Sequence, residues 1–530
     1  MNQVESTGQT LADMSVALTG SGGSGVVTAG EILLDALARA GFCGLMTRSA
    51  GPQIRGGESA VMLRFSRQPV DAMNDRFDVL VGLDWLNVGR FLDEIPLDAG
   101  SRIFADPAAG PIPGPLLESG ARVREYPFKE YVDAVPGGRV NMAAIGVLGA
   151  VTGLPLEALE AGARGVLANK RKDTVSSSIA CIRSAYANAA GTPLVDHRGP
   201  GNDLARWCLS GNEATGLGAL RAGVRFVAAY PITPASEILE WLAPRLEQVG
   251  GSLLQAEDEL ASINMIIGAS FGGVPSLTAT SGPGLSLMME GLGLAVASET
   301  PVVVVNVQRG GPSTGLPTKS EQSDLNIALY GLHGDAPHLV LAPLSIGDCA
   351  YTTHWAAGLA EHLQAAAIVL SDQSLAQSRA ITPPLTETPA VLTRRVQQSP
   401  TEEYARYALT EDGVSPMTLP GVPGGMYTAD GLEHNEQGAP STLAAHHLAQ
   451  LGKRRSKLEA FEYGDAWAEI RGAGGLAIVT WGSASGAVFE AASRLETQGR
   501  TVRVIAVRLL APLRSQALAQ ALDGAEQVWV

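Results

Sequence analysis

Three short stretches in the middle of the chain carry the residue types that do chemistry. Tyr230-Pro-Ile-Thr-Pro234 places a hydroxyl between two prolines, Glu257-Asp-Glu259 groups carboxyl groups where an apolar helical pattern begins, and Arg309 follows a run of β-branched residues. A carboxyl group in apolar surroundings can exchange protons near neutral pH. An arginine at a strand end can bind a carboxylate through two parallel hydrogen bonds. Together these residues suit acid–base chemistry on a ligand that carries a carboxylate.

Each stretch also has an ordinary structural interpretation. Two prolines fix the backbone, so the pentapeptide can be only a rigid turn between a strand, Val224 to Ala229, and a helix that begins at Ser236. Acidic residues at a helix start stabilise the helix dipole without any catalytic role. A third segment, Thr278-Ala-Thr-Ser-Gly-Pro-Gly284, is a strand that ends in a glycine turn, and both interpretations stay open for it.

These stretches resemble the pyrimidine-binding half of a thiamine diphosphate enzyme, specifically the α chain of the 2-oxoacid:ferredoxin oxidoreductases. The resemblance implies that the Thr233 hydroxyl faces the oxo acid and that Arg309 binds the substrate carboxylate. The residues that it assigns to the cofactor are Glu259, Tyr230, Pro231, Ile232, Ser281, Gly282 and Gly284.

The resemblance also implies a catalytic role for Glu259. A carboxyl group bonded to N1′ of the aminopyrimidine favours the imino tautomer, which acts as the base toward the thiazolium C2 proton. Gly268 follows Glu259 at the spacing found in other thiamine diphosphate enzymes, whereas Glu257 lies outside this register and is the weaker candidate. We expect Leu260 and Ile263 to provide apolar surroundings that ease proton exchange.

A glycine-rich turn near the N-terminus, Gly20-Ser-Gly-Gly-Ser-Gly25, lies between an apolar strand and an amphipathic helix. A phosphate could approach the start of that helix. However, Val26 stands where a nucleoside triphosphate loop needs lysine, and Met46-Thr-Arg-Ser49 stands where a dinucleotide site needs an acid. A tight turn without a ligand and a ligand with an extra phosphate both stay open.

A second turn, Gly51-Pro-Gln-Ile-Arg-Gly-Gly57, follows and adds another cation. The two turns resemble the γ domain of the 2-oxoacid oxidoreductases, here fused ahead of the α domain. Members of that family use coenzyme A, which carries the extra phosphate. The resemblance therefore makes Gly22, Gly25, Arg48 and Arg55 the candidates for coenzyme A binding.

The chain has 530 residues, 62 glycines and 45% hydrophobic residues, which favours several α/β domains built on parallel sheets. We predict a γ-type domain over 14–190, a pyrimidine-binding thiamine diphosphate domain over 203–375 and an extended connecting segment over 376–465. Residues 466–530 resemble the C-terminal domain of transketolase-type enzymes. Whether the chain continues beyond Val530 stays open.

The net charge of −15 argues against nucleic acid as a partner. No apolar run is long enough to span a membrane and no signal peptide is indicated, so we expect a cytoplasmic protein. The four cysteines, Cys43, Cys181, Cys208 and Cys349, contain no C-x-x-C pair. We therefore expect buried free thiols and neither a metal site nor an iron–sulfur site on this chain.

The diphosphate half of a thiamine site is missing. Such enzymes hold the diphosphate through Mg²⁺ with Gly-Asp-Gly and a later Asn, and neither Gly347-Asp-Cys349 nor Gly464-Asp-Ala466 fits. The family's β chains carry that half and a 4Fe–4S cluster, so the resemblance implies a β subunit, ferredoxin as electron acceptor and a dimer of heterodimers. His434 and Lys453-Arg-Arg455 also resemble family segments, although a surface histidine and a solvated charge run are the simpler interpretations.

The resemblance implies the fused γ–α subunit of an enzyme that oxidatively and reversibly decarboxylates a 2-oxo acid with coenzyme A. Gly310 to Pro317, Glu321 to Asp324 and His333 to Asp335 resemble the variant that converts 2-oxoglutarate to succinyl-CoA. Pyruvate, branched-chain and aryl 2-oxo acids stay open as substrates. A non-catalytic assembly or regulatory subunit is the alternative of another class. A nicotinamide dehydrogenase is disfavoured by the missing acid.

Overall fold

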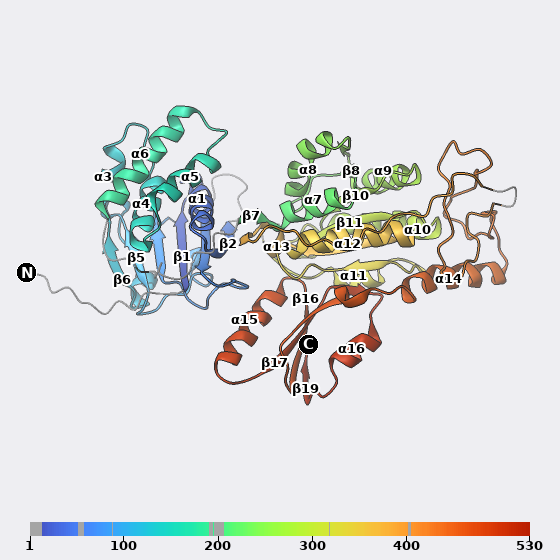
Figure 1. The fold of residues 1–530 in the computed structure, drawn as a ribbon. Helices are drawn as coiled ribbons and strands as arrows, with labels where there is room; N and C mark the ends of the chain where they lie inside the picture. Colours follow the sequence, from blue (N-terminus) through green and yellow to red (C-terminus); the bar gives the residue numbers. More distant parts are fainter. Residues whose placement is uncertain are drawn as a thin grey trace, which may run out of the picture. The chain divides into compact units, whose positions relative to one another are not determined.

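The computed structural model describes residues 13–50, 58–86, 88–189, 194, 206–316, 319–400 and 404–530. The chain forms two compact units. The first comprises Met1–Leu209 and Ser378–Pro384, and the second comprises Ser210–Gln377 and Leu385–Val530. Both are α/β structures, as the sequence predicts (Figure 1).

The first unit is built on an eight-stranded sheet in the order β6-β5-β4-β1-β3-β2-β14-β7. Its strands are β1 (Asp13–Gly20), β2 (Cys43–Ala50), β3 (Ser59–Ser66), β4 (Val79–Gly82), β5 (Arg102–Ala105), β6 (Arg122–Glu125), β7 (Trp207–Ser210) and β14 (Arg379–Thr382). β1, β4, β5 and β6 are parallel, but β3 runs antiparallel to both β1 and β2. The sheet is therefore mixed rather than mostly parallel. The stretch between β2 and β3 is too short for the crossover that parallel neighbours need.

Helices cover both faces of this sheet. α1 (Val26–Arg39), α3 (Phe128–Asp133), α4 (Val140–Thr152), α5 (Leu156–Val166) and α6 (Lys172–Asn188) pack on one face, and η1 (Val88–Phe91), η2 (Pro107–Ala109) and α2 (Gly114–Glu118) lie toward the other. The predicted helix after the glycine-rich turn is confirmed as α1, with Ile32, Leu33 and Leu37 buried against the sheet. This helix begins at the carboxyl end of β1.

The second unit is built on a seven-stranded sheet in the order β18-β12-β13-β11-β10-β8-β9. Its strands are β8 (Phe226–Ala229), β9 (Ser252–Gln255), β10 (Ser276–Thr280), β11 (Val302–Gln308), β12 (Leu339–Leu341), β13 (Ala366–Asp372) and β18 (Leu509–Ala511). All neighbours are parallel except β12 and β18. β11 is central and buried along its whole length, which confirms the prediction for Val302 to Val305.

Two layers of helices enclose this sheet. α7 (Gly211–Arg221), α8 (Ser236–Gln248) and α12 (Asp348–Leu363) share a core with one face, and α9 (Glu259–Phe271), α10 (Gly282–Ala297) and α11 (Leu325–Tyr330) share a core with the other. A short helix, α13 (Gln373–Gln377), follows β13. Because the strands are parallel, the turns after β8, β10, β11 and β13 meet at one edge of the sheet, where open α/β sheets bind ligands.

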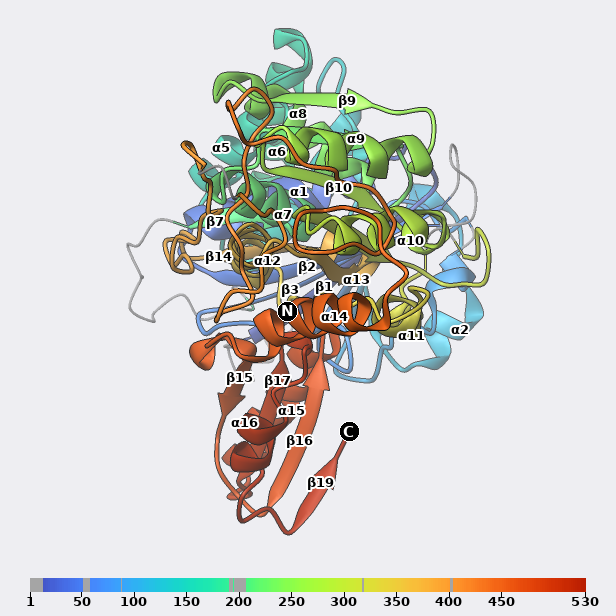
Figure 2. The same ribbon diagram turned by 90° about the vertical axis from the view of Figure 1, so that its right-hand side faces the viewer.

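The end of the chain forms a four-stranded sheet in the order β15-β17-β16-β19, which extends away from the larger sheet (Figures 1 and 2). Its elements are β15 (Ala468–Arg471), β16 (Leu476–Trp481), α15 (Ala484–Thr497), β17 (Val502–Val507), α16 (Ser515–Ala521) and β19 (Gln527–Trp529). The predicted strand–helix–strand–helix order is confirmed. Arg508 attaches this sheet to the seven-stranded sheet through Asp348, with Nη2 at 2.9 Å from Oδ1.

The segment between the two sheets of the second unit packs onto that unit. Arg394 pairs with Glu361 of α12 at 2.8 Å, and α14 (Ala444–Glu459) and η3 (Gly464–Trp467) follow. His434 is only 2% exposed, and Lys453 and Arg454 are each 5% exposed. The interpretation of these three residues as solvated surface groups is therefore wrong, because the segment folds back and buries one face of α14. Arg455, on the other face, is exposed.

Candidate active site

The predicted pentapeptide lies at the carboxyl end of β8. Tyr230 is 41% exposed and Thr233 is exposed, whereas Pro234 is buried. Asn212, near the start of α7 and 1% exposed, donates from Nδ2 to the Pro234 carbonyl oxygen at 2.9 Å. A neighbouring helix therefore fastens one end of the turn and leaves its other residues facing outward. Nothing in the sequence around Asn212 shows that its amide would reach this turn.

The three acidic residues at the start of α9 have different surroundings. Asp258 is the N-cap, and its Oδ1 accepts a hydrogen bond from the Ala261 backbone N–H at 2.7 Å. Glu257 is exposed, but Glu259 is only 7% exposed. Ile263 is fully buried as predicted. Leu260, by contrast, is 50% exposed and does not enclose the carboxyl group, because it lies on the outer face of the helix.

Glu259 meets the glycine turn after β10. A Cβ placed on Gly284 would lie 2.6 Å from Glu259 Oε1 and 2.1 Å from Thr280 Oγ1. Only glycine fits at this position, and it lets the carboxyl group and the Thr280 hydroxyl approach the first turn of α10 together. Among the described residues, no group donates a hydrogen bond to the Glu259 carboxyl. Thr280 belongs to the stretch Thr278 to Gly284, but the sequence does not predict that its hydroxyl would approach this turn beside Glu259.

Ser281 occupies the N-cap position of α10 but does not cap the helix with its side chain. Its Oγ is buried and has no partner within the described part of the chain. A buried hydroxyl without a partner costs about 1–3 kcal/mol. Ser281 therefore offers a hydrogen bond to a ligand at the turn, which fits its predicted contact with a cofactor.

Arg309 lies directly after β11 and is only 7% exposed. Its Nη1 donates to the Thr233 carbonyl oxygen at 2.6 Å, across 76 residues of sequence. Burial lowers the pKa of Arg309, although nearby Asp324 acts in the opposite direction. Its Nε is buried without a partner in the described structure. The fold thus brings the pentapeptide and the proposed carboxylate-binding arginine into direct contact.

The segment after Arg309 returns to the same edge. Gly310 and Leu316 form an isolated bridge, and the Gly311 backbone N–H donates to Glu321 Oε2 at 3.0 Å. Asp324 then accepts a hydrogen bond from Asn306 of β11 at 2.8 Å. Burial raises the pKa of Asp324. Asp324 belongs to a stretch singled out in the sequence, but the sequence does not predict its contact with β11.

A cavity of about 590 Å³ lies at the start of α1 in the first unit. Gly25 is left-handed there (φ 84°), and its carbonyl oxygen accepts from Asn141 Nδ2 at 3.0 Å. Arg139, Lys170 and Arg171 line the cavity, and Asn141 Oδ1 is buried with no partner among the described residues. The three cations at a helix start suit an anion, whereas the Asn141 oxygen only accepts hydrogen bonds and does not contribute to this.

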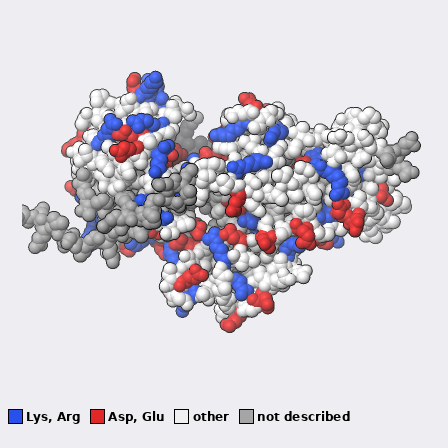
Figure 3. Space-filling model, viewed as in Figure 1, with Lys and Arg blue, Asp and Glu red and all other residues white. Residues whose placement is uncertain are grey.

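The predicted residues of this region are only partly brought together. Gly25 lines the cavity, whereas Gly22 and Arg48 are not among its lining residues. Arg48 is exposed on β2, whose carboxyl end lies at the same sheet edge as Gly20. Arg55 lies outside the described residues. Lysine and arginine side chains also gather over α5 and α6 (Figure 3), where Arg164, Lys172 and Arg183 line a second cavity of about 530 Å³.

Neither a metal cluster nor a membrane span is found in the described ranges. No group of three or more His, Cys, Asp or Glu residues in them could hold a metal ion. No described helix is both long enough and apolar enough to cross a bilayer. Cys43, Cys181 and Cys349 are buried free thiols as predicted, and Cys208 is half-buried.

Comparison with known proteins agrees with this geometry. Residues 15–188 match the family model for pyruvate ferredoxin/flavodoxin oxidoreductase. Residues 217–453 match the thiamine diphosphate-binding model of pyruvate flavodoxin/ferredoxin oxidoreductase. The second match contains all the predicted cofactor and catalytic residues.

Individual relatives extend the match. The 2-oxoacid:ferredoxin oxidoreductase 2 alpha subunit of Aeropyrum pernix is 30% identical over 98% of this chain and 90% of its own length. The 2-oxoglutarate synthase subunit KorA of Methanothermobacter thermautotrophicus is 43% identical over 45% of this chain and 64% of its own length.

A solved structure is also similar. The 2-oxoglutarate:ferredoxin oxidoreductase from Magnetococcus marinus, with 2-oxoglutarate, coenzyme A and succinyl-CoA bound, has a TM-score of 0.88 and 34% identity. The similarity covers 98% of this chain and 91% of that chain. These matches show that the chain belongs to the alpha subunits of the 2-oxoacid:ferredoxin oxidoreductases.

Proposed function

We propose that this chain supplies the pyrimidine-side half of an active site that oxidatively decarboxylates a 2-oxo acid. One observation carries the proposal. Glu259 meets Thr280 over Gly284, and Arg309 bonds to the pentapeptide at Thr233, all at one edge of a parallel sheet. A 2-oxo acid and coenzyme A give an acyl-CoA, CO2, a proton and two electrons, which pass to ferredoxin.

The residues at this edge fit thiamine diphosphate. Within the described ranges, no group donates to the Glu259 carboxyl and none pairs with the Ser281 hydroxyl, and Gly284 lets the Glu259 carboxyl approach the first turn of α10. When bound, the cofactor supplies the electron sink that decarboxylation of a 2-oxo acid requires. Glu259 would hold a proton at its carboxyl oxygen for exchange with the pyrimidine ring. Tyr230, Pro231 and Ile232 would line the cofactor on the side of β8.

Arg309 and Thr233 act on the substrate in this proposal. The Arg309 Nη1 is occupied by the Thr233 carbonyl, which holds the guanidinium in place while its remaining donors stay available for a carboxylate. The Thr233 side chain is exposed and can donate to the oxo group of the same molecule. The two contacts would orient the bond between the carboxylate and the oxo carbon.

We propose 2-oxoglutarate as the substrate. Three similar proteins support this choice. Two are named as 2-oxoglutarate synthase subunits, and one is a solved 2-oxoglutarate:ferredoxin oxidoreductase with 2-oxoglutarate bound. Glu321 to Asp324, one of the segments that resemble the 2-oxoglutarate variant, returns to the proposed carboxylate-binding arginine, because the Ser323 hydroxyl donates to the Arg309 carbonyl oxygen. Its position next to the substrate gives it the means to select the substrate side chain.

We propose the cavity at the start of α1 for the phosphates of coenzyme A. Three cations and an uncapped helix start favour an anion there. A Cβ on Gly25 would lie 2.2 Å from Asn141 Nδ2, so glycine is needed for this backbone approach. Exchanging Lys170 for alanine should raise the KM for coenzyme A and leave the KM for the 2-oxo acid unchanged.

A β subunit completes the active site in this proposal. It would bring the Mg²⁺–diphosphate half and the 4Fe–4S cluster, and two such pairs would form the complex. Leu260, in the first turn of α9, and Leu287, in the second turn of α10, are 50% and 47% exposed. Apolar side chains at this position support an interface with a second chain.

The direct test is reconstitution with a β chain of this family. The complex is assayed with coenzyme A, a viologen dye and a panel of 2-oxoglutarate, pyruvate, branched-chain and aryl 2-oxo acids. We expect thiamine-dependent dye reduction with the highest kcat/KM for 2-oxoglutarate. Activity on none of these acids, in a complex loaded with thiamine diphosphate and iron, would contradict the proposed function. A higher kcat/KM for another acid would contradict the substrate assignment alone.

A further inference from the structure

Asp324 occupies the N-cap position of α11, but its side chain does not cap that helix. An aspartate at the N-cap position usually accepts a hydrogen bond from the first helical turn. The Asp324 side chain makes no such bond. Its carboxyl group is directed instead toward the carboxyl ends of β10 and β11, where the proposed active site lies. This orientation requires another explanation than helix capping.

Two strand ends meet at this carboxyl group. Asn306, the third residue from the end of β11 and fully buried, donates from Nδ2 to Asp324 Oδ2 at 2.8 Å. A Cβ on Gly282 would lie 2.7 Å from Asp324 Oδ1, so the carboxyl group packs directly on the first residue of α10. A carboxylate beside a helix N-terminus is also favoured by the helix dipole.

The backbone of Asp324 is held at the same place. Its N–H donates to Gln308 Oε1 at 3.0 Å, and Gln308 Nε2 donates in turn to the Ser371 carbonyl oxygen at 3.2 Å. Next to it, the Ser323 hydroxyl donates to the Arg309 carbonyl oxygen at 3.2 Å. The segment that follows β11 from Arg309 therefore returns to the end of β11 at Asp324, and these hydrogen bonds hold its two ends together.

Asp324 also acts on Arg309 electrostatically. Burial lowers the pKa of Arg309 and raises that of the half-buried Asp324, and the opposite charge of the other group acts against burial in each case. In such surroundings charges interact more strongly than in water. The Arg309 guanidinium is held by the Thr233 carbonyl oxygen, and the Arg309 carbonyl oxygen is held by Ser323, the residue next to Asp324.

We propose that Asp324 is a positioning residue that ties the Gly282 turn to the end of β11, through Asn306 and Gln308, and so fixes the place of the substrate-binding Arg309. The proposal rests on the function proposed above for Arg309. Asp324 would not touch the substrate. It would keep the guanidinium at a fixed place relative to the cofactor-facing turn, so that carboxylate binding also orients the oxo carbon. Misplacement of a positioned group by about 1 Å can lower a rate by about 10².

The test compares Asp324→Ala, Asp324→Asn and Arg309→Lys in the complex with the β chain. Asp523→Asn is the matched control, because Asp523 is exposed and follows α16, outside every segment proposed to bind substrate. We expect Asp324→Ala to lower kcat/KM for the 2-oxo acid by about 10- to 100-fold per thiamine-loaded site. The KM for coenzyme A should stay unchanged. Asp324→Asn keeps an acceptor for Asn306, so its kcat/KM for the 2-oxo acid should lie between those of the parent and the alanine variant.

A double variant tests whether Asp324 acts through Arg309. If it does, Asp324→Ala adds little to the defect of Arg309→Lys, because contacting residues that share one function are not additive. If the fold-losses of the two single variants multiply in the double variant, the inference is wrong. A lower thermal midpoint with parent kinetics per loaded site would also overturn it, because that outcome describes a structural role only. Should the alanine variant fail to assemble, parent kinetics in Asp324→Asn would overturn the inference as well.

The two proposals fail in different ways. If Arg309→Lys raises the KM for the 2-oxo acid but both Asp324 variants behave as the parent, the role of Asp324 is wrong and the proposed function stands. If Arg309→Lys leaves that KM unchanged, the carboxylate site is wrong and the inference about Asp324 falls with it.

Discussion

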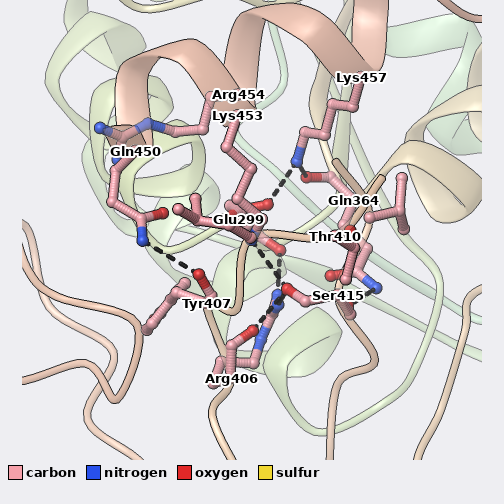
Figure 4. Close-up of polar contacts among 12 residues, drawn as sticks. Glu299, Gln364, Arg406, Tyr407, Thr410, Ser415, Gln450, Lys453, Arg454 and Lys457 are labelled. Carbon is pink, nitrogen blue, oxygen red and sulfur yellow. Dashed lines mark hydrogen bonds and ion pairs between the residues drawn. The ribbon is translucent and has the colours of Figure 1, made fainter. Parts of the chain in front are cut away.

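Two buried glutamates at opposite ends of the same layer show how differently one residue type can be used. Glu259 lies at the carboxyl edge of the seven-stranded sheet, is 7% exposed and receives no hydrogen bond from the described residues. Glu299 precedes β11 at the amino edge, is fully buried and pairs with two lysines (Figure 4). The first carboxyl group is free for a ligand. The second is already neutralised within the chain.

The partners of Glu299 come from distant parts of the sequence. Lys453 Nζ lies 2.6 Å from Oε1 and Lys457 Nζ lies 2.7 Å from Oε2, so one face of α14 is fastened to the end of α10. Arg406 donates from Nη2 to the Glu299 carbonyl oxygen at 2.9 Å. The pKa of Glu299 would be raised by burial alone, but the two lysines and Arg406 lower it. Buried charges of this kind persist only when they are paired.

The comparison teaches that burial of a charged residue does not by itself indicate a catalytic role. What distinguishes Glu259 is that its carboxyl group has no partner in the part of the chain that the structure describes and lies where parallel strands end. Glu299 has the more perturbed environment, but its chemistry is satisfied inside the fold. Exchanging each glutamate for glutamine should therefore give opposite results.

The largest expected effect is on catalysis by Glu259→Gln. The amide is nearly isosteric, so assembly and cofactor binding should survive, but it cannot exchange a proton with the pyrimidine ring. General acid–base groups contribute roughly 10² to 10⁴ in rate. We expect a loss of this order in turnover with an unchanged thermal midpoint. Glu257→Gln is the matched control, because Glu257 is exposed, and it should remain near normal. If the control is the crippled variant, the assignment of the carboxyl group is wrong.

Glu299→Gln should produce the reverse pattern. Two buried ammonium groups would lose their carboxylate, and breaking a buried pair in this way costs about 3–5 kcal/mol. We expect a lower thermal midpoint and faster hydrogen exchange in α14, with parent turnover per thiamine-loaded site. Glu469→Gln removes an exposed pair with Arg471 and should change stability by less than about 1 kcal/mol. Normal stability of Glu299→Gln would show that the cluster does not hold the segment in place.

The same cluster predicts an acid dependence of stability. Because the pKa of Glu299 is lowered from its ordinary value of 4.5, its contribution is complete above that pH and is lost as the pH falls below it. The difference in thermal midpoint between the parent and Glu299→Gln should shrink in acid, where the Glu299 carboxylate of the parent is protonated. A difference that does not depend on pH would mean that the charge of Glu299 does not stabilise the fold.

The smallest effect is expected where the active-site segment touches the last sheet. Gly482, after β16, has a φ of 66°, and a Cβ there would lie 2.2 Å from Gln322 Nε2. Gly482→Ala should cost about 1–2 kcal/mol in stability, mainly from the left-handed backbone. We expect at most a small rise in the KM for the 2-oxo acid. A tenfold or larger rise would show that the last sheet, and not Asp324 alone, positions this segment.

Much of the second unit could be predicted from local patterns. The turn after β8, the starts of α7, α8 and α9, and the buried strand β11 follow from proline and glycine placement, acidic helix starts and runs of β-branched residues. The mixed sheet of the first unit could not be predicted with the same ease, because β3 pairs with both β1 and β2 and strand order depends on contacts that periodicity does not encode.

The candidate site could likewise be predicted only in part from the sequence. Glu259, Thr233, Arg309 and the turn from Ser281 to Gly284 were predicted because they form continuous motifs. Thr280, Asn212 and Asp324 were missed as site groups, since their contacts join residues far apart in the chain. His434 and Lys453 were assigned to the surface because the weak periodicity of their segment hides the face that is buried.

By itself, the sequence determined which residues could do chemistry and the order of the elements that carry them, because helix starts, turns and buried strands depend on neighbouring residues. Only the tertiary structure decided which of those residues have internal partners. Glu259 and Glu299 are both glutamates beside apolar helices, and their difference lies in two lysines more than 150 residues away from Glu299 along the chain. Partnering across such separations is set by how the layers pack, and it separates the residue available to a ligand from the residue that holds the fold together.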